Sequence, residues 1–250
     1  MSVVVAEFPD IGVTAVSRWI FNCYVVHDGG EGRPIIVDPG LPSTTLVALD
    51  LARSISPYPP VVVATHGHVD HVGGLPLVER HGATVCLPDR IRRYLDGEVP
   101  RSPGLRAIAK VRAILGEQPR SLGAVGEIAR TARHTGYDRR GARFPLGTDH
   151  WLVDGTALPM APSWQVLAVP GHTDDSTALW NERAGVLISG DAVLSRGGRA
   201  WFTPEICDVP AANSTAIRLR GLDVAALLPG HGRVVRGDGV LGDAIGAALR

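Results

Sequence analysis

The chain of 250 residues has few cysteines, a single lysine and no excess of charge of either sign. Its three cysteines, Cys23, Cys86 and Cys207, are far apart and odd in number, which excludes a disulfide-stapled scaffold and predicts reduced, buried side chains. Basic and acidic residues number 25 each, so the net charge of +0 provides no general attraction to nucleic acid or to an anionic membrane.

Long apolar runs are also absent. No stretch reaches the roughly 20 residues that span a bilayer, and the first residues lack the basic start, apolar core and small-residue cleavage site of a secretory signal. We therefore expect a cytoplasmic protein with no membrane span and no nucleic-acid partner. The length, with 45% hydrophobic and 20% charged residues, suits one α/β domain with a full core.

Three histidines and an aspartate crowd residues 66–71, directly after an apolar, strand-like run. Such a cluster would bury much polar surface without partners unless it bound a cation. Neutral imidazole is a ligand for zinc, iron, nickel and copper, and an adjacent carboxylate extends the choice to manganese. Residues two apart point to the same side of an extended chain, so His66 and His68 can hold one metal ion. Asp70 and His71 continue past the strand end and can reach a second ion.

Three later apolar strands each run into a glycine-flanked residue of metal-ligating type, namely His172, Asp191 and His231. An earlier strand, residues 34–37, ends at Asp38, whose other role is turn formation before Pro-Gly. Polar residues at the ends of apolar strands are where α/β proteins place their chemistry. We interpret the repeated delivery of His or Asp at separate strand ends as one shared site.

Strands and helices alternate along much of the chain, which predicts an α/β fold with helices covering sheets. A helix is expected from Ser43, as its N-cap, to about Ser54. The locally basic segment at about 100–147 has two runs of apolar residues at helical spacing, near residues 105–115 and 122–132, which predict a pair of helices. Because no low-complexity linker divides the chain, we expect residues 1–250 to form a single domain with a helical insert at about 100–147.

The histidine-rich motif and the three later ligand positions resemble the metallo-β-lactamase fold superfamily, in the order found there. The resemblance covers most of the chain and leaves only the segment at about 100–147 unmatched. It implies an α/β fold built as a four-layer αββα sandwich, in which two β-sheets stack face to face between outer helices and the metals sit at one edge.

The resemblance also implies a role for each candidate residue. The ligands of the first metal are His66, His68 and His172. The ligands of the second metal are Asp70, His71 and His231. It further implies that Asp191 bridges both metals and that Asp38 supports the site by fixing a ligating histidine.

Site chemistry of this kind predicts hydrolysis, because metals lower the pKa of water and a metal-bridging hydroxide can attack a carbonyl or phosphorus centre. Asp70 is the catalytic candidate that orients the nucleophile or carries its proton to the leaving group. We expect a metal-dependent hydrolase of a carboxylic ester, thioester or lactone bond in a small-molecule substrate. The expected cofactors are two Zn ions, with Fe or Mn as alternatives.

Other functions stay open from the sequence. One is a mononuclear iron oxidoreductase resembling the persulfide dioxygenases, which use fewer of these ligands. A phosphodiesterase is a weaker alternative, since the overall charge is neutral. A metal-binding module without catalysis is the third, and the complete ligand set disfavours it.

Overall fold

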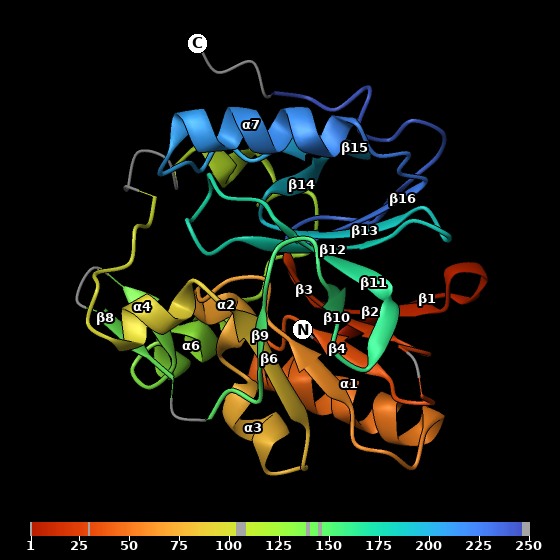
Figure 1. Cartoon of the computed structure of the whole chain (residues 1–250), viewed down its shortest axis with the longest axis vertical. Coiled ribbons are helices and arrows are strands. Elements are labelled where there is room, and N and C mark those ends of the chain that lie inside the picture. Colours follow the sequence, from red (N-terminus) through yellow and green to blue (C-terminus); the bar gives the residue numbers. More distant parts are fainter. Residues whose placement is uncertain (1, 30, 104–108, 139–140, 145–146, 247–250) are drawn as a thin grey trace.

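Two β-sheets stack face to face in the computed structural model, which describes residues 2–29, 31–103, 109–138, 141–144 and 147–246 (Figure 1). One sheet has seven strands in the order β1-β2-β3-β4-β5-β6-β9, and the other has six in the order β10-β11-β12-β13-β16-β17. Helices lie on the outer face of each sheet, so the predicted αββα sandwich is confirmed.

The seven-stranded sheet is antiparallel from β1 to β4 and parallel from β4 to β9. Its strands are β1 (Val4–Phe8), β2 (Val13–Arg18), β3 (Phe21–Val26), β4 (Ile35–Val37), β5 (Val61–Val63), β6 (Thr84–Pro88) and β9 (His150–Leu152).

The six-stranded sheet is antiparallel except for the parallel pair β13 and β16. Its strands are β10 (Ala157–Leu158), β11 (Ala161–Ala168), β12 (Thr177–Asn181), β13 (Val186–Gly190), β16 (Ala226–Pro229) and β17 (Val235–Arg236). Two separate hairpins add the strands β7 (Gly136–Asp138), β8 (Gly141–Arg143), β14 (Val193–Arg196) and β15 (Arg199–Phe202).

Helices α1 and α3 cover the seven-stranded sheet, and α7 covers the six-stranded sheet (Figure 1). The helices are α1 (Pro42–Ile55), α2 (Val69–Val72), α3 (Leu75–Glu79), α4 (Ile91–Leu95), α6 (Leu122–Thr131) and α7 (Val209–Arg220), with 3-10 turns η1 (Pro9–Ile11) and η2 (Ala109–Ala113). No helix in the described ranges is both long enough and apolar enough to cross a bilayer.

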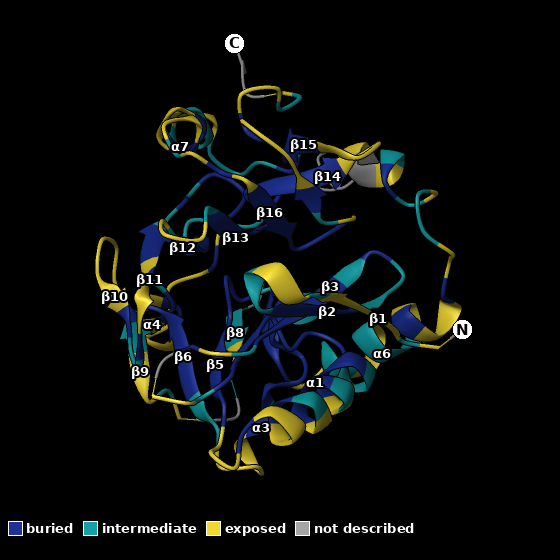
Figure 2. Ribbon diagram, turned by 90° about the vertical axis from the view of Figure 1, so that its right-hand side faces the viewer, coloured by how far each residue is buried: buried dark blue, intermediate teal, exposed yellow. Residues whose placement is uncertain are grey.

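Alternation of side chains along the central strands builds two cores from one run of apolar residues. In β4, Ile35 and Val37 pack between the sheets, whereas Ile36 packs outward under Ala48 and Leu49 of α1. Successive side chains of a strand point to opposite faces, so a strand covered on both faces is apolar throughout. Figure 2 shows this as buried strands between half-exposed helices.

The expectation that Ser43 caps α1 is wrong. The N-cap is Leu41, and Pro42 is the first helical residue, a position that tolerates the missing N–H of proline. Ser43 instead donates both its backbone N–H and its hydroxyl to the carboxylate of Glu127 in α6, at 3.3 and 2.8 Å. Arg18 of β2 pairs with the same carboxylate. A carboxylate from a distant helix therefore occupies the start of α1.

The segment at about 100–147 is only partly as expected. The helix near residues 122–132 is confirmed as α6. The helix near residues 105–115 is wrong over its described part, where only the 3-10 turn η2 forms and residues 104–108 lie outside the described ranges. Tertiary contacts compete with helix continuation here, because Trp19 Nε1 donates to the Leu115 carbonyl at 3.1 Å. Strands β7 and β8 were not expected, and the single-domain assignment stays a prediction.

The difference in burial between Ile36 and Ile217 predicts how much each side chain contributes to the stability of the fold. Ile36→Ala, at a side chain that is 0% exposed, should lower the free energy of unfolding by about 2–5 kcal/mol through lost burial and the cavity left behind. Ile217→Ala, on α7 at 76% exposure, is the matched control and should change it by less than about 0.5 kcal/mol. Urea denaturation measures both, and equal losses would contradict this packing.

Candidate metal centre

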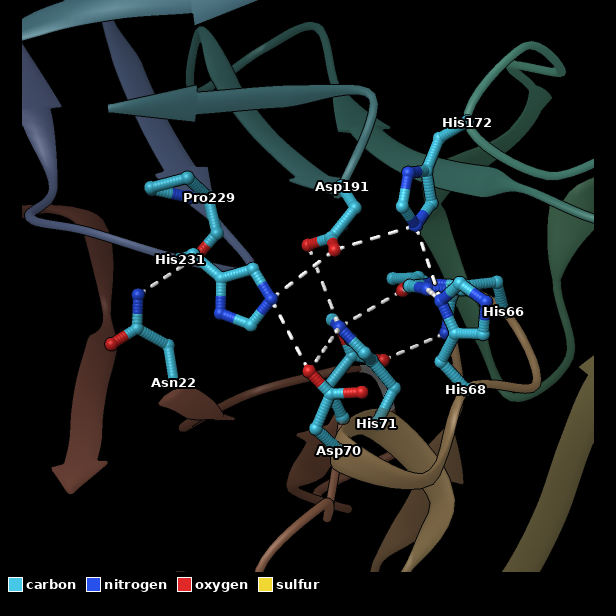
Figure 3. A network of polar contacts seen from close by, with 12 residues as sticks. Asn22, His66, His68, Asp70, His71, His172, Asp191, Pro229 and His231 are labelled. Carbon is cyan, nitrogen blue, oxygen red and sulfur yellow. Dashed lines mark hydrogen bonds and ion pairs between the residues drawn. The ribbon is translucent and has the colours of Figure 1, made fainter. Parts of the chain in front are cut away.

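All seven residues predicted as metal ligands meet at one edge of the sandwich, where strands from both sheets end (Figure 3). Strands β4 and β5 are parallel neighbours in one sheet, and β13 and β16 are parallel neighbours in the other. The carboxyl ends of such pairs lie at the same edge, so the residues that follow them come together. The predicted supporting residue, Asp38, follows β4 and lies at the same place.

The first group of ligand atoms consists of three imidazole nitrogens. Nδ1 of His68 lies 3.0 Å from Nε2 of His66 and 3.2 Å from Nε2 of His172. Burial lowers the pKa of His68 to about 3, with the neighbouring His172 acting in the same direction. Neutral imidazole is the form that binds metal, and three converging nitrogens would otherwise repel one another through their lone pairs.

The second group joins Asp70 and His71, both placed by the short helix α2, to His231 beyond β16. Oδ2 of Asp70 lies 3.3 Å from Nε2 of His231 and 3.8 Å from Nε2 of His71. Two nitrogens and one oxygen at this separation are a further group of atoms that could hold a divalent ion.

The carboxylate of Asp191 lies between the two groups. Its Oδ2 is 3.5 Å from Nε2 of His172 and 3.2 Å from Nε2 of His231, while Oδ1 is 3.4 Å from Nε2 of His71. Oδ1 of Asp191 and Nε2 of His71 are buried and have no hydrogen-bond partner within the described residues. Buried polar atoms left without partners on a shared centre fit a divalent metal ion.

Charges within the cluster shift several pKa values. Burial opposes ionisation of Asp191, yet the adjacent His231 and His71 hold the pKa of its carboxyl well below the usual range. Burial likewise disfavours a charged His231, but Asp191 and then Asp70 raise its pKa to about 10. When no metal is bound, protons on the imidazole rings therefore compensate the negative charge of the carboxylates.

Asp38 fixes the orientation of His71. The ring nitrogen Nδ1 of His71 donates to Oδ2 of Asp38 at 2.9 Å, which leaves Nε2 free as a ligand. Asp38 in turn accepts the backbone N–H of Thr65 at 2.7 Å and its hydroxyl at 2.9 Å. The same hydroxyl lies 3.2 Å from Nδ1 of His66, so one buried carboxylate orients two histidines of the site.

Backbone carbonyls orient His172 and His231. Nδ1 of His172 donates to the carbonyl of Glu205 at 2.9 Å, and Nδ1 of His231 donates to the carbonyl of Ile20 at 3.2 Å. Each ring thereby presents Nε2 to the centre. This pattern selects the tautomer that a metal ligand requires.

Two glycines make the close approach of these loops feasible. A Cβ atom built on Gly230 would lie 2.3 Å from Oδ1 of Asp191 and 2.8 Å from Cε1 of His71. A Cβ atom on Gly40 would lie 1.5 Å from the backbone oxygen of Asp70. Only a residue without a side chain allows these backbones to pass each other here.

A tyrosine and an aspartate that the sequence did not single out as site residues hold the histidine-rich loop. Asp175 is buried and accepts the backbone N–H of Gly67 at 2.8 Å and the hydroxyl of Tyr137 at 2.6 Å. The ring of Tyr137 lies 5.2 Å from the ring of His68.

Glu205 is a third residue that sequence reasoning missed. A carboxylate oxygen of Glu205 lies within 4.8 Å of ligand atoms of His172 and Asp191. Burial, and then the charge of Asp191, raises the pKa of Glu205 to about 7. No motif marks it, because it lies in a loop between β15 and α7 rather than directly at a strand end.

Gly230→Ala should damage the metal centre without changing any ligand. The added methyl group collides with Asp191 and His71, so we expect metal affinity to fall by about 10- to 100-fold, the size of effect known for altered ligand support. Gly126→Ala in α6, where a Cβ meets nothing within 4 Å, is the control and should keep full affinity. Metal content after dialysis against graded chelator measures both, and equal affinities would contradict this geometry.

Comparisons with known proteins agree with this architecture. The probable metallo-hydrolase YflN of Bacillus subtilis is 25% identical over 243 residues, covering 88% of this chain and 84% of the relative. A hydroxyacylglutathione hydrolase of Methylococcus capsulatus is 29% identical over 175 residues, 70% of this chain and 48% of the relative. This chain therefore spans about half the length of that relative.

Solved structures give the same picture of the fold. TTHA1623 in a di-iron-bound form is 26% identical, with a TM-score of 0.56 over 91% of this chain and 93% of that one. A metallo-beta-lactamase from Pontibacter korlensis is 17% identical, with a TM-score of 0.61 over 96% of both chains. The family model of the metallo-beta-lactamase superfamily matches residues 18–231, a span that contains every candidate ligand. The chain belongs to the metallo-beta-lactamase superfamily.

Proposed function

We propose that this metal-dependent hydrolase uses two divalent metal ions to cleave a carboxylic ester, thioester or lactone bond in a small-molecule substrate. The observation that carries the proposal is the double convergence of ligand atoms, with Asp191 between the two groups. One such group of ligand atoms alone would fit many kinds of metal site. Two groups sharing a carboxylate are the arrangement of two-metal hydrolases.

The proposed ligands form two sets, each supported by one of the overlapping groups of ligand atoms. The first ion is assigned to His66, His68 and His172. The second ion is assigned to Asp70, His71 and His231. The carboxylate of Asp191 is assigned to both ions, because Oδ2 lies between Nε2 of His172 and Nε2 of His231.

Zinc is the proposed metal, because the donors are imidazole nitrogens and carboxylate oxygens, without a thiolate. The same donor set also suits iron and manganese. The likeness to a protein with a di-iron form supports iron as the first alternative. Metal identity in the cell therefore depends on supply as well as on the ligands.

Bound divalent ions would supply a nucleophilic water at neutral pH and polarise the scissile carbonyl. The protein itself holds the metal ligands in position and transfers protons. Asp70 is 19% exposed at its side chain whereas Asp191 is 3% exposed, so Asp70 is the carboxylate that an incoming water or leaving group can reach. We assign Asp70 to orient the nucleophile and to pass its proton to the leaving group.

Thioesters are the favoured bond within this class. Hydroxyacylglutathione hydrolases from Methylococcus capsulatus and Stenotrophomonas maltophilia are 29% and 23% identical to this chain over 70% and 74% of its length.

The segment at about 100–147 is proposed as an insert beside the site. In support, Tyr137 hydrogen-bonds to Asp175, and Glu127 binds Ser43 next to the loop of Asp38.

Asp70→Asn and His172→Ala should each lower hydrolysis of the best substrate by at least about 100-fold, by removing a proton carrier and a ligand respectively. The measurement is kcat/KM of metal-loaded protein on a panel of activated esters, thioesters and lactones. Asp50→Asn and His81→Ala, both at exposed side chains, are the matched controls and should keep normal rates.

Near-normal rates in both site variants would reject the assignment. Metal analysis on the same samples separates the other function class. One iron per chain with oxygen consumption on a persulfide substrate would replace the hydrolase with a mononuclear oxidoreductase.

A further inference from the structure

The loop that carries Glu205 is tied to the metal centre by its backbone. It connects β15 to α7, and its carbonyl at Glu205 accepts Nδ1 of His172 at 2.9 Å. The backbone N–H of Glu205 donates to the hydroxyl of Thr203 at 3.3 Å. The position of this side chain is therefore set by the same contact that orients a proposed metal ligand.

The Glu205 side chain points into the site and has no partner there. The residue is 9% exposed, and a carboxylate oxygen lies within 4.8 Å of ligand atoms of His172 and Asp191. Among the described residues, no hydrogen bond or ion pair reaches this carboxylate. Burial and the second carboxylate nearby both disfavour a negative charge on Glu205 when no donor or cation is present.

Two described arginines pair with carboxylates that follow His172 and Glu205 in the chain, and not with Glu205 itself. Arg90 pairs with Asp174 and Glu98, and Arg101 pairs with Asp208. Both cations are thus engaged by other carboxylates. An acceptor beside the candidate metal site that the described residues leave unmatched is available to a donor on the ligand.

We propose that Glu205 selects substrates whose acyl group carries a hydrogen-bond donor close to the scissile carbonyl, an ammonium group best and a hydroxyl next. It excludes acyl groups that carry a carboxylate at the same place. A charge-assisted hydrogen bond favours the first class, and repulsion between like charges rejects the second. This inference rests on the proposed function and specifies its substrate class.

The test uses four thioesters of N-acetylcysteamine that differ only at the third acyl carbon. The acyl groups are 3-aminopropanoyl, 3-hydroxypropanoyl, propanoyl and 3-carboxypropanoyl. We expect kcat/KM to fall in that order, with about 10- to 100-fold between the ammonium and the unsubstituted acyl group. Glu205→Gln should flatten the series, and Glu205→Lys should reverse it. Glu182→Lys, the same charge change in the exposed turn after β12, should leave it unchanged.

A binding measurement separates this inference from the proposed function. Thiols bind divalent metals without any turnover, so the metal-loaded protein is titrated with 2-aminoethanethiol and with 3-mercaptopropanoate. The native chain should prefer the ammonium thiol, and Glu205→Lys should prefer the carboxylate thiol. If this preference holds while none of the four thioesters is hydrolysed, thioester hydrolysis is wrong and the role of Glu205 stands.

Two results would overturn the role of Glu205. One is hydrolysis of all four thioesters at equal kcat/KM, or equal affinity for the two thiols. The other is loss of metal from Glu205→Gln, which would make the carboxylate a metal ligand instead of a substrate contact.

Discussion

The charge on the buried carboxylate of Asp191 is the constraint on which this structure depends. It is 3% exposed, has one oxygen without a hydrogen bond, and lies between histidines from both sheets. A buried negative charge is costly unless a cation or hydrogen-bond donors compensate it. Without metal, protons on His71 and His231 compensate this charge, as their raised pKa values indicate, and bound divalent metal would take the place of those protons.

Asp191 meets the histidines that compensate its charge only when both sheets are correctly stacked. His66 follows β5 in one sheet, whereas Asp191 and His231 follow β13 and β16 in the other. Their approach is close enough that Gly230 cannot carry a side chain. Metal binding therefore favours the packed sandwich over any state in which the sheets separate, so the metal centre and the fold stabilise each other.

The meeting of the candidate ligands could be predicted in part, because His66, Asp191 and His231 each follow an apolar strand of a parallel pair, and the carboxyl ends of such pairs lie at one edge. Asp38 was predictable for the same reason. Local rules failed where distant segments compete. Glu127 binds the start of α1 and displaces Ser43 from the expected cap. Three further residues beside the site come from loops or from the segment at about 100–147, namely Asp175, Tyr137 and Glu205. In such segments the spacing of hydrophobic residues does not predict which way a side chain points.

Anomalous diffraction from crystals of the metal-loaded protein tests the central claim most directly. Two peaks are predicted, one among His66, His68 and His172 and one among Asp70, His71 and His231. Both should lie within bonding distance of Asp191, about 2.0–2.2 Å for zinc and a carboxylate oxygen. A single peak, or two peaks that Asp191 does not join, would contradict the account.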